Sequence, residues 1–463
     1  MSSANEPASA PREGFIRRIP TGYKVVAVMV LLVILAVAGR ILYFDSKINS
    51  ELAAIRKAGF PVTLDELNAW YPMPSGENAA DTYEAAFAAY GGDDSGVPLL
   101  DDEVRLPPRG HPLPEDMRSK IAAYLAANAQ ALALLHKGGV IEGCRFHVNA
   151  TQAYDMPLPH LNRLRQAARL LELEILLKAD EGKPDEAAAA IADSFAIARH
   201  LRNEPILRSQ LVRIAVDFRS LEGLERVLSR IALGDKPLAD LAKSLEAEES
   251  QEGILRGMVG ERCEGLSALD DPRELGAFNT GLYSGYLRPM PYRDPSSGMI
   301  YLYRFGGLWQ LDRLKYLQMT SELVGATGGT MKDMRERDAQ VCKEAFDLPE
   351  TYLISRLVLT SLTSDYDSQL NCFARLRAAR AGIAVERFRM ANGRLPESLD
   401  QLVPKFLDSV PSDPWDDKPI RYKKLTKGFV TYSVGPDLKD DGGKERDSWK
   451  ADAPYDITFT VER

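Results

Sequence analysis

The residues that could do chemistry in this chain are few, and most of them are scattered. The sequence contains five histidines and four cysteines. Cys144 and His147 are three residues apart and His160 follows further along, an arrangement that could begin a metal site. Because no fourth ligand is evident, a structural or incidental use of these side chains is the stronger interpretation.

A second candidate is a pair of carboxylates. Glu77 and Asp81 are four residues apart, so they would share one face of a helix that began there and could act as general acid and base. The alternative is that Glu77 stabilises the first turn of that helix through the helix dipole. The chain has no H-E-x-x-H arrangement, Walker loop or G-x-S-x-G elbow. We therefore expect no catalytic residues, no organic cofactor and no enzymatic activity.

Length and composition limit the kinds of protein this can be. A chain of 463 residues is expected to form two or three folded parts. Its 58 Lys and Arg against 66 Asp and Glu give a net charge of −8, which argues against a nucleic-acid partner. The four cysteines form no C-x-x-C pair, so a zinc knuckle is not indicated, although one or two disulfides remain open.

The clearest single feature is an apolar stretch near the amino terminus. Residues 25–44 read VVAVMVLLVILAVAGRILYF, and about twenty apolar residues in a helix match the hydrocarbon thickness of a bilayer. Arg40 lies near one end, where its long side chain can reach the headgroups. Basic residues before the stretch favour a cytoplasmic amino terminus. We expect a disordered cytoplasmic tail over residues 1–24 and a single-pass helix in the inner (cytoplasmic) membrane.

A cleaved signal peptide is the competing interpretation of the same stretch. Ala36-Val37-Ala38 is a small-x-small sequence that follows a shorter apolar run, as at a signal-peptidase site. Both interpretations place the rest of the chain outside the cytoplasm.

Residues 45–365 are expected to form an irregular, antiparallel helical body. Apolar residues at intervals of three and four mark one helical face, namely Leu161, Leu164, Ala168, Leu171 and Ile175. Gly182 and Pro184 end that helix and begin the next. We expect a loop over residues 91–118, a helix over residues 119–136, and helices over residues 308–346.

The start of this body resembles the membrane-proximal block of large exported bacterial proteins that have no settled activity. The resemblance implies a location and no chemistry. It is carried by Gly59, Pro61, Leu67, Tyr71, Glu77, Asn78 and Ala79.

The carboxy-terminal part, residues 366–463, has a more specific resemblance. A long helix over residues 366–391 is followed by a period-two run, FVTYSV, between glycines. This part resembles the soluble half of the major pseudopilin of type II secretion systems, which implies a small α+β domain with a helix packed on an antiparallel sheet. The matching residues are Asn392-Gly393-Arg394, Pro396, Leu399, Leu402, Asp413-Pro414-Trp415, Pro419, Tyr422, Tyr432-Ser433, Gly435, Asp437 and Gly442-Gly443.

The same resemblance implies a calcium site, because that family binds calcium in the loop after its last strands. Calcium takes six to eight oxygen ligands, which carboxylates can supply. The candidate ligands here are Asp437, Asp440, Asp441 and Asp456. The alternative is a solvated acidic turn, since Asp and Gly are ordinary turn residues.

These features together predict a mainly α-helical, membrane-tethered protein that acts in protein interaction or envelope assembly. Its partners would be the membrane, through residues 25–44, and other proteins. Two alternatives stay open. One is an exported hydrolase whose site lies between the helical body and the Tyr-rich segment of residues 281–305, and the other is a peptide- or lipid-binding module.

Overall fold

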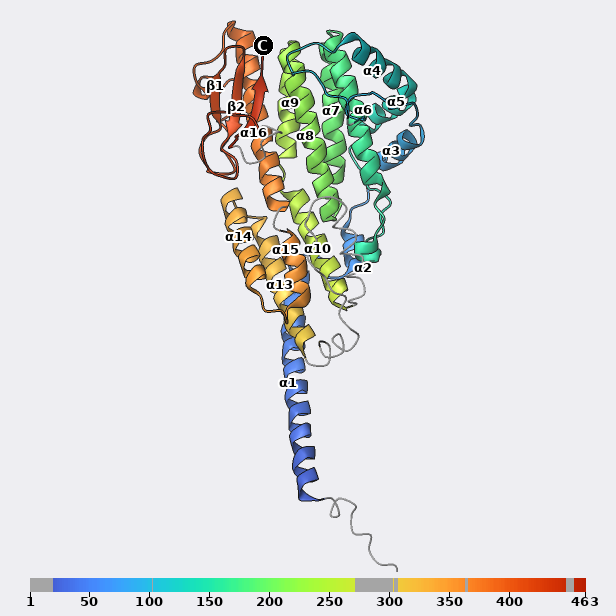
Figure 1. Ribbon diagram of the computed structural model, residues 1–463, viewed down its shortest axis with the longest axis vertical. Helices are drawn as coiled ribbons and strands as arrows, with labels where there is room; N and C mark the ends of the chain where they lie inside the picture. Colours follow the sequence, from blue (N-terminus) through green and yellow to red (C-terminus); the bar gives the residue numbers. More distant parts are fainter. Residues whose placement is uncertain (1–19, 102, 271–302, 304–306, 363–364, 447–453) are drawn as a thin grey trace, which may run out of the picture.

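The computed structural model describes residues 20–101, 103–270, 303, 307–362, 365–446 and 454–463 (Figure 1). Most of the Tyr-rich segment, residues 281–305, therefore lies outside the described residues, as does most of the predicted tail. The α-helices are α1 (Thr21–Lys57), α2 (Leu64–Trp70), α3 (Ala79–Ala88), α4 (Glu115–Ala127), α5 (Ala129–Gly139), α6 (Pro159–Asp180), α7 (Pro184–Leu201), α8 (Leu207–Arg230), α9 (Asp235–Glu248), α10 (Glu252–Asp270), α13 (Leu308–Ala326), α14 (Met331–Asp347), α15 (Leu353–Ser361) and α16 (Asp365–Asn392). Short 3-10 helices are η2 (Ala150–Asp155) and η4 (Leu399–Leu402), and the strands are β1 (Arg421–Lys424), β2 (Phe429–Ser433) and β3 (Ile457–Val461).

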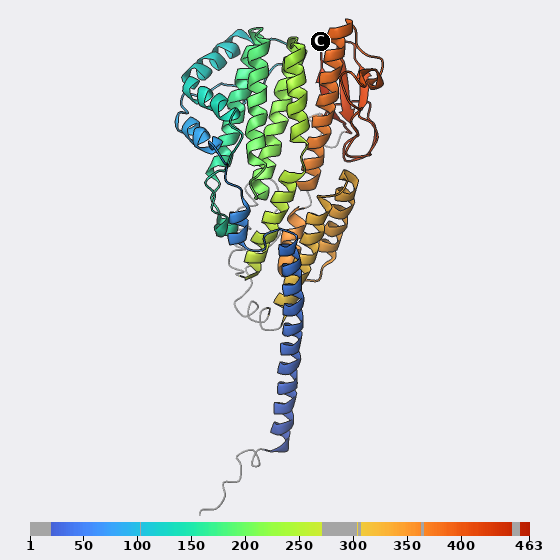
Figure 2. The same ribbon diagram turned by 180° about the vertical axis from the view of Figure 1, so that it is seen from behind.

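Helix α1 projects from the body as a long rod (Figure 2). Its 37 residues include a window that is apolar enough and long enough to cross a membrane, and none of that window is buried in the protein. The carboxy-terminal end of α1 packs against α13, with Ile48 and Ile55 buried there. The same helix thus passes without a break from the apolar segment into the folded body.

The centre of the body is an antiparallel array of α6, α7 and α8, which pack against one another (Figure 1). The junction between α6 and α7 follows the sequence prediction, because Gly182 has a positive φ of 69° and Pro184 occupies the first turn of α7. The predicted apolar face of α6 is confirmed, since all five of its marker residues are buried.

Helix α10 approaches the start of α8 unusually closely. A Cβ atom on Gly260 would lie 2.0 Å from the carbonyl oxygen of Pro205, and one on Gly253 would lie 2.4 Å from Oε1 of Gln210. Real Cβ atoms do not come this near to other atoms. Gly260 therefore requires glycine, because it faces backbone, whereas at Gly253 the end of the Gln210 side chain would have to move. The absence of side chains at these glycines allows α10 to lie this close to the start of α8.

The carboxy-terminal part consists of α16 and a small antiparallel sheet in the order β1-β2-β3. Gly382 of α16 allows the sheet to approach, because a Cβ there would lie 2.6 Å from the ring of Phe459. α16 also packs against α8 and α9, and one apolar core joins residues of α7, α8, α9, α16 and the sheet. The predicted long helix and the strand at FVTYSV are confirmed.

Several predicted elements differ from the structure. The helix expected over residues 119–136 is two helices, α4 and α5, which meet at Asn128, whose side chain hydrogen-bonds to Gly91. By contrast, the helices expected over residues 308–346 are confirmed as α13 and α14. The disordered tail predicted over residues 1–24 ends too late in the sequence, because Thr21–Lys24 already belong to α1. No disulfide joins the four cysteines, all of which lie in the described part of the chain.

Candidate functional site

A large cleft lies between the helical body and the carboxy-terminal sheet, with a volume of about 920 Å³. Its walls come from α6, α8, α16, β3 and the loop before α4. Six of the lining residues carry carboxylates: Glu172, Glu222, Glu225, Glu445, Asp456 and Glu462. Four carry guanidinium groups: Arg109, Arg226, Arg375 and Arg446. The cleft is therefore a charged site, with more acidic than basic side chains.

Glu225 of α8 holds the walls of the cleft together. Its carboxylate accepts a hydrogen bond of 2.7 Å from Nη2 of Arg375 on α16 and another of 2.7 Å from the backbone N–H of Thr460 on β3. A longer contact of 3.4 Å joins it to Arg109. Burial raises the pKa of Glu225, although these donors oppose the shift. One buried carboxylate thus connects a helix of the body to the edge strand of the sheet.

Glu172 of α6 is a buried carboxyl group of the cleft whose pKa lies near neutral pH. It is 2% exposed, and burial raises its pKa to about 7 even though Arg219 donates a hydrogen bond of 2.9 Å to it. Its neighbour Glu222 raises the pKa further. A buried carboxyl group with such a pKa changes its charge near physiological pH.

Two side chains of α16 face α8 across the cleft. Arg375 lies over the ring of Phe218, with 5.6 Å between the guanidinium carbon and the ring centroid. Asn371 is one helical turn earlier, and its Oδ1 atom is buried without a hydrogen-bond partner. Buried acceptors are normally satisfied; this oxygen is unpaired, and it also has almost no solvent-accessible surface, so it is not open to the cleft.

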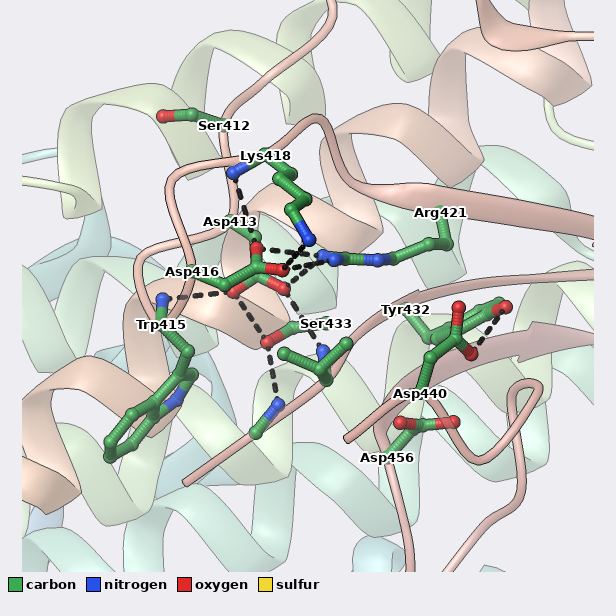
Figure 3. A network of polar contacts seen from close by, with 12 residues as sticks. Ser412, Asp413, Trp415, Asp416, Lys418, Arg421, Tyr432, Ser433, Asp440 and Asp456 are labelled. Carbon is green, nitrogen blue, oxygen red and sulfur yellow. Dashed lines mark hydrogen bonds and ion pairs between the residues drawn. The ribbon is translucent and has the colours of Figure 1, made fainter. Parts of the chain in front are cut away.

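The predicted calcium loop lies next to this cleft, because Asp456 belongs to both. The two Asp456 oxygens accept hydrogen bonds from the backbone N–H groups of Asp441, at 3.3 Å, and Gly443, at 2.7 Å. Asp440 accepts from the hydroxyl of Tyr432 at 3.1 Å, and the two side chains meet in Figure 3. The four predicted ligands are thus placed in one loop region, with Asp437 turned to the N–H of Lys439 at 3.1 Å.

The electrostatics of this loop are compatible with a cation. Burial raises the pKa of Asp456, and the nearby carboxylates of Asp440 and Asp441 add to the shift. Asp441 Oδ2 is buried without a hydrogen-bond partner. Within the residues that the structure describes, however, no group of three or more His, Cys, Asp or Glu side chains is arranged to hold a metal ion. Calcium binding stays a prediction.

A second polar network lies beside the loop, centred on Asp413 (Figure 3). Asp413 is fully buried and accepts hydrogen bonds from the backbone of Trp415 at 2.9 Å and Val434 at 2.9 Å. It also accepts from Oγ of Ser433 at 2.7 Å and from Nη1 of Arg421 at 2.5 Å. With four donors on its two oxygens, this carboxylate joins the loop before β1 to the end of β2.

The candidate metal site of Cys144, His147 and His160, which the sequence analysis judged the weaker interpretation, is not formed in the described part of the chain. The side chain of His147 is 74% exposed and its Nε2 lies 3.1 Å from Asp81. Cys144 and His160 are buried, and His160 contacts the buried carboxylate of Glu204 at 3.0 Å. His147 is close to Cys144 in the sequence, but its side chain points to the solvent, whereas Cys144 and His160 are buried.

The carboxylate pair of Glu77 and Asp81 is also not formed. Asn78 is the N-cap of α3, and its side chain accepts from the N–H of Ala80. Glu77 therefore precedes the helix and shares no helical face with Asp81. The expected role of Glu77 in the first helical turn is wrong for the same reason.

A histidine that the sequence analysis did not single out has the closest charged partners. Nδ1 of His136 lies 2.6 Å from Asp193 and Nε2 lies 3.1 Å from Glu174. The hydrogen bonds to these carboxylates raise the pKa of His136 to about 10, so it is a stable cation at neutral pH. It links α5 to α6 and α7, and it is unsuited to act as a general base.

Sequence reasoning also missed the cleft. One local signal was present, because Glu172 and Glu174 interrupt the apolar run LLELEILL within a helix. A charged residue at such a position is seldom fully buried without a partner. Comparisons of the chain with family models, with curated proteins and with solved structures found no match.

Proposed function

We propose that this protein is a membrane-tethered binding protein of the bacterial cell envelope that acts in protein interaction or envelope assembly. In this proposal α1 spans the inner membrane, with its amino terminus in the cytoplasm. The folded body lies on the other side and offers the charged cleft to a protein partner.

The observation that carries the proposal is the position of the cleft relative to the anchor. The walls that α6, α8 and the sheet supply belong to the half of the body opposite the projecting part of α1 (Figure 1). Because α1 enters the body as one continuous helix, it would hold the cleft away from the bilayer. That placement suits contact with another protein of the envelope.

The lining of the cleft favours a polar partner over a lipid. Its volume of about 920 Å³ falls within the range of ~300–1,000 Å³ that is typical of ligand sites. Ligand pockets are usually mostly apolar, whereas ten charged side chains line this one. A lipid chain would displace the water that solvates these charged groups, and it could offer no hydrogen bonds or opposite charges in its place.

The proposal also assigns the carboxy-terminal part to a pseudopilin-like domain, reused outside a pseudopilus. It is supported by α16 packing on a three-stranded antiparallel sheet and by the loop of Asp437 beside it. In a pseudopilin the membrane helix leads directly into the long helix, whereas residues 58–364 separate α1 from α16 here. We therefore propose a shared domain and no role as a pilus subunit.

Site-specific photocrosslinking in intact cells tests the proposal. A benzoylphenylalanine at Tyr455, in the cleft, should give a discrete crosslinked product with another protein. The matched control is Phe346, an aromatic residue of α14 that is 52% exposed and does not line the cleft. Equal products from both positions, or none from Tyr455, would reject the cleft as the interaction site.

Alkaline carbonate extraction tests the anchor separately. The full-length chain should stay in the membrane pellet. Release of a protein that lacks its first 38 residues would instead show that the apolar segment is a cleaved signal peptide.

A further inference from the structure

The face of α1 that packs on the body begins within the apolar segment. Gly307, the residue before α13, lies against α1, since a Cβ atom there would be 3.5 Å from Cγ1 of Ile41 and 3.8 Å from Nε of Arg40. From this level on, α13 runs beside α1, and both views show its start at the edge of the body from which α1 projects (Figure 1; Figure 2). The apolar segment of residues 25–44 therefore ends only after the body has begun.

The length of the projecting part of α1 leads to the same level. Thr21 to Arg40 are twenty residues, which at about 1.5 Å per residue form a rod about 30 Å long. The hydrocarbon layer of a bilayer is also about 30 Å thick. A bilayer around this part of α1 leaves no length of helix as a spacer. The nearer end of the body then meets the lipid headgroups.

Two cations of α1 converge on this level. The guanidinium carbon of Arg40 lies 5.6 Å from the ring centroid of Phe44, one turn later in the helix. Nζ of Lys47 lies 5.9 Å from the ring centroid of Tyr43, one turn earlier. Arg40 thus extends away from the apolar segment, whereas Lys47 extends back toward it. Basic side chains at the end of a membrane helix take such directions when their charges lie among the headgroups.

The protein does not neutralise these two cations. Arg40 and Lys47 are exposed, and within the described part of the chain neither of them forms an ion pair, although Asp45 lies between them along α1. Arg313 of α13 differs, because Asp270 is its partner. Two unpaired positive charges at this end of the body are complementary to the phosphate groups of lipids.

The apolar and aromatic side chains at this level also suit a bilayer surface. Leu42 is 70% exposed and Tyr43 is 59% exposed, although both lie beside the start of the folded body. Trp309 in the first turn of α13 is half-buried, and its Nε1 donates to the carbonyl of Leu269 at 2.5 Å. Tyr and Trp are enriched where membrane proteins cross the headgroup region.

We infer that the base of the body, formed by residues 40–47 of α1 and the first turn of α13, rests on the bilayer and binds lipid phosphate through Arg40 and Lys47. Both side chains would donate hydrogen bonds to phosphate oxygens. Tyr43 and Trp309 would lie at the depth of the headgroups. The inference rests on the proposed function, since it requires that α1 spans the membrane. It adds that the body is held against the bilayer at its base while the cleft lies at the opposite end.

Photocrosslinking of the full-length protein in nanodiscs of phosphatidylethanolamine and phosphatidylglycerol tests the position of the base. Benzoylphenylalanine at Trp309 should form an adduct with phospholipid, which mass spectrometry detects. The control position is Met390, which is 47% exposed near the end of α16, in the half of the body opposite the projecting part of α1 (Figure 1). It should form no lipid adduct. Leu32, 59% exposed within the apolar segment, should form one because α1 crosses the bilayer there.

The pattern of adducts separates this inference from the proposed function. An adduct at Leu32 without one at Trp309 would overturn the inference and leave the membrane anchor in place. Equal adducts at Trp309 and Met390 would also overturn it. The absence of an adduct at Leu32 would reject the anchor itself, and the inference with it.

Variants test the contacts with phosphate. Native mass spectrometry in detergent measures the affinity of the full-length protein for phosphatidylglycerol. The double variant Arg40→Gln/Lys47→Gln should bind this lipid at least about fivefold more weakly, because two cations near the lipid surface are lost. Thermal unfolding of the variant should match that of the unmodified protein, since both side chains are exposed.

The matched control is the double variant Arg394→Gln/Lys427→Gln. It removes two exposed cations at the other end of the body, and Arg394 lies 5.6 Å from the ring centroid of Phe388, as Arg40 does from that of Phe44. It should change the affinity for phosphatidylglycerol by less than about twofold, because these cations are far from the lipid surface. Equal effects of the two double variants would overturn the assignment of Arg40 and Lys47.

Discussion

The Asp413 network and the charged cleft lie in the same part of the molecule but differ in how completely their polar groups are satisfied. Asp413 is fully buried and receives four hydrogen bonds from the chain itself. In the cleft, Glu222 is half exposed and the Asn371 oxygen has no hydrogen-bond partner. A saturated buried network has little left to offer a ligand, whereas the cleft keeps charged side chains such as Glu222 that are open to solvent.

Removal of the Asp413 carboxylate should have the largest effect on stability. Asp413→Ala leaves the donors of Trp415, Ser433 and Val434 without their acceptor in a buried place. We expect a loss of about 3–5 kcal/mol, as for a broken buried charge pair. Thermal unfolding in detergent measures it, with Asp408→Ala as an exposed control that should cost less than about 0.5 kcal/mol. A small effect at Asp413 would remove the contrast between the two regions.

The pH dependence of stability should reveal the buried carboxyl group of the cleft. The pKa of Glu172 is about 7 in the folded protein against an ordinary 4.5, so the folded state holds its proton more tightly. Stability is then lost as the pH rises from about 4.5 through 7, by up to about 3 kcal/mol. Relative to the unmodified protein, Glu172→Gln should gain stability across this window. A pH-independent difference between the two proteins would contradict the raised pKa.

Calcium should raise the unfolding temperature if the loop of Asp437, Asp440, Asp441 and Asp456 binds it. A site at one hundred times its dissociation constant stabilises a protein by about 2.7 kcal/mol. The unfolding midpoint of the full-length chain is compared in calcium and in chelator, because α16 shares its core with the body. Asp440→Asn should abolish the shift, and Asp347→Asn on α14 should preserve it. Identical midpoints in calcium and chelator would reject the site.

The smallest effect on stability is expected at Glu222. Its side chain is 51% exposed and its one ion pair with the described residues is 3.6 Å long, so Glu222→Gln should change the free energy of unfolding by less than about 0.5 kcal/mol. Thermal unfolding beside Asp413→Ala provides the comparison. A loss similar to that of Asp413→Ala would make Glu222 a structural residue, no different in this respect from Asp413.

The fold was predictable where a pattern is local. Apolar length predicted α1, periodicity predicted the buried face of α6, and alternation predicted β2. The break between α4 and α5 was not predictable, because two of the three side-chain hydrogen bonds of Asn128 are with Gly91, 37 residues away, and the third is with the carbonyl of Tyr124. The sequence of one helix does not indicate a hydrogen-bond partner that lies so far away along the chain.

The candidate site was less predictable than the fold. The acidic loop was identified through a resemblance. Asp456 accepts a hydrogen bond from the N–H of Asp441, but the described residues contain no group of three such side chains arranged to hold a metal ion, and the calcium site stays a prediction. The cleft was missed because Glu225 meets Thr460 from 235 residues away, and a sequence does not show such contacts. Glu172 is the one lining residue with a local signal, its charge within an apolar run, and that signal was not used in the sequence analysis.

Amide hydrogen exchange of the full-length protein, with and without the partner protein identified by crosslinking at Tyr455, tests most directly that the cleft is the binding region. We expect added protection in the segments that line it, around residues 216–226 and 455–460, and no change over residues 413–434. Protection of residues 413–434 instead, or no change in either region, would contradict the account.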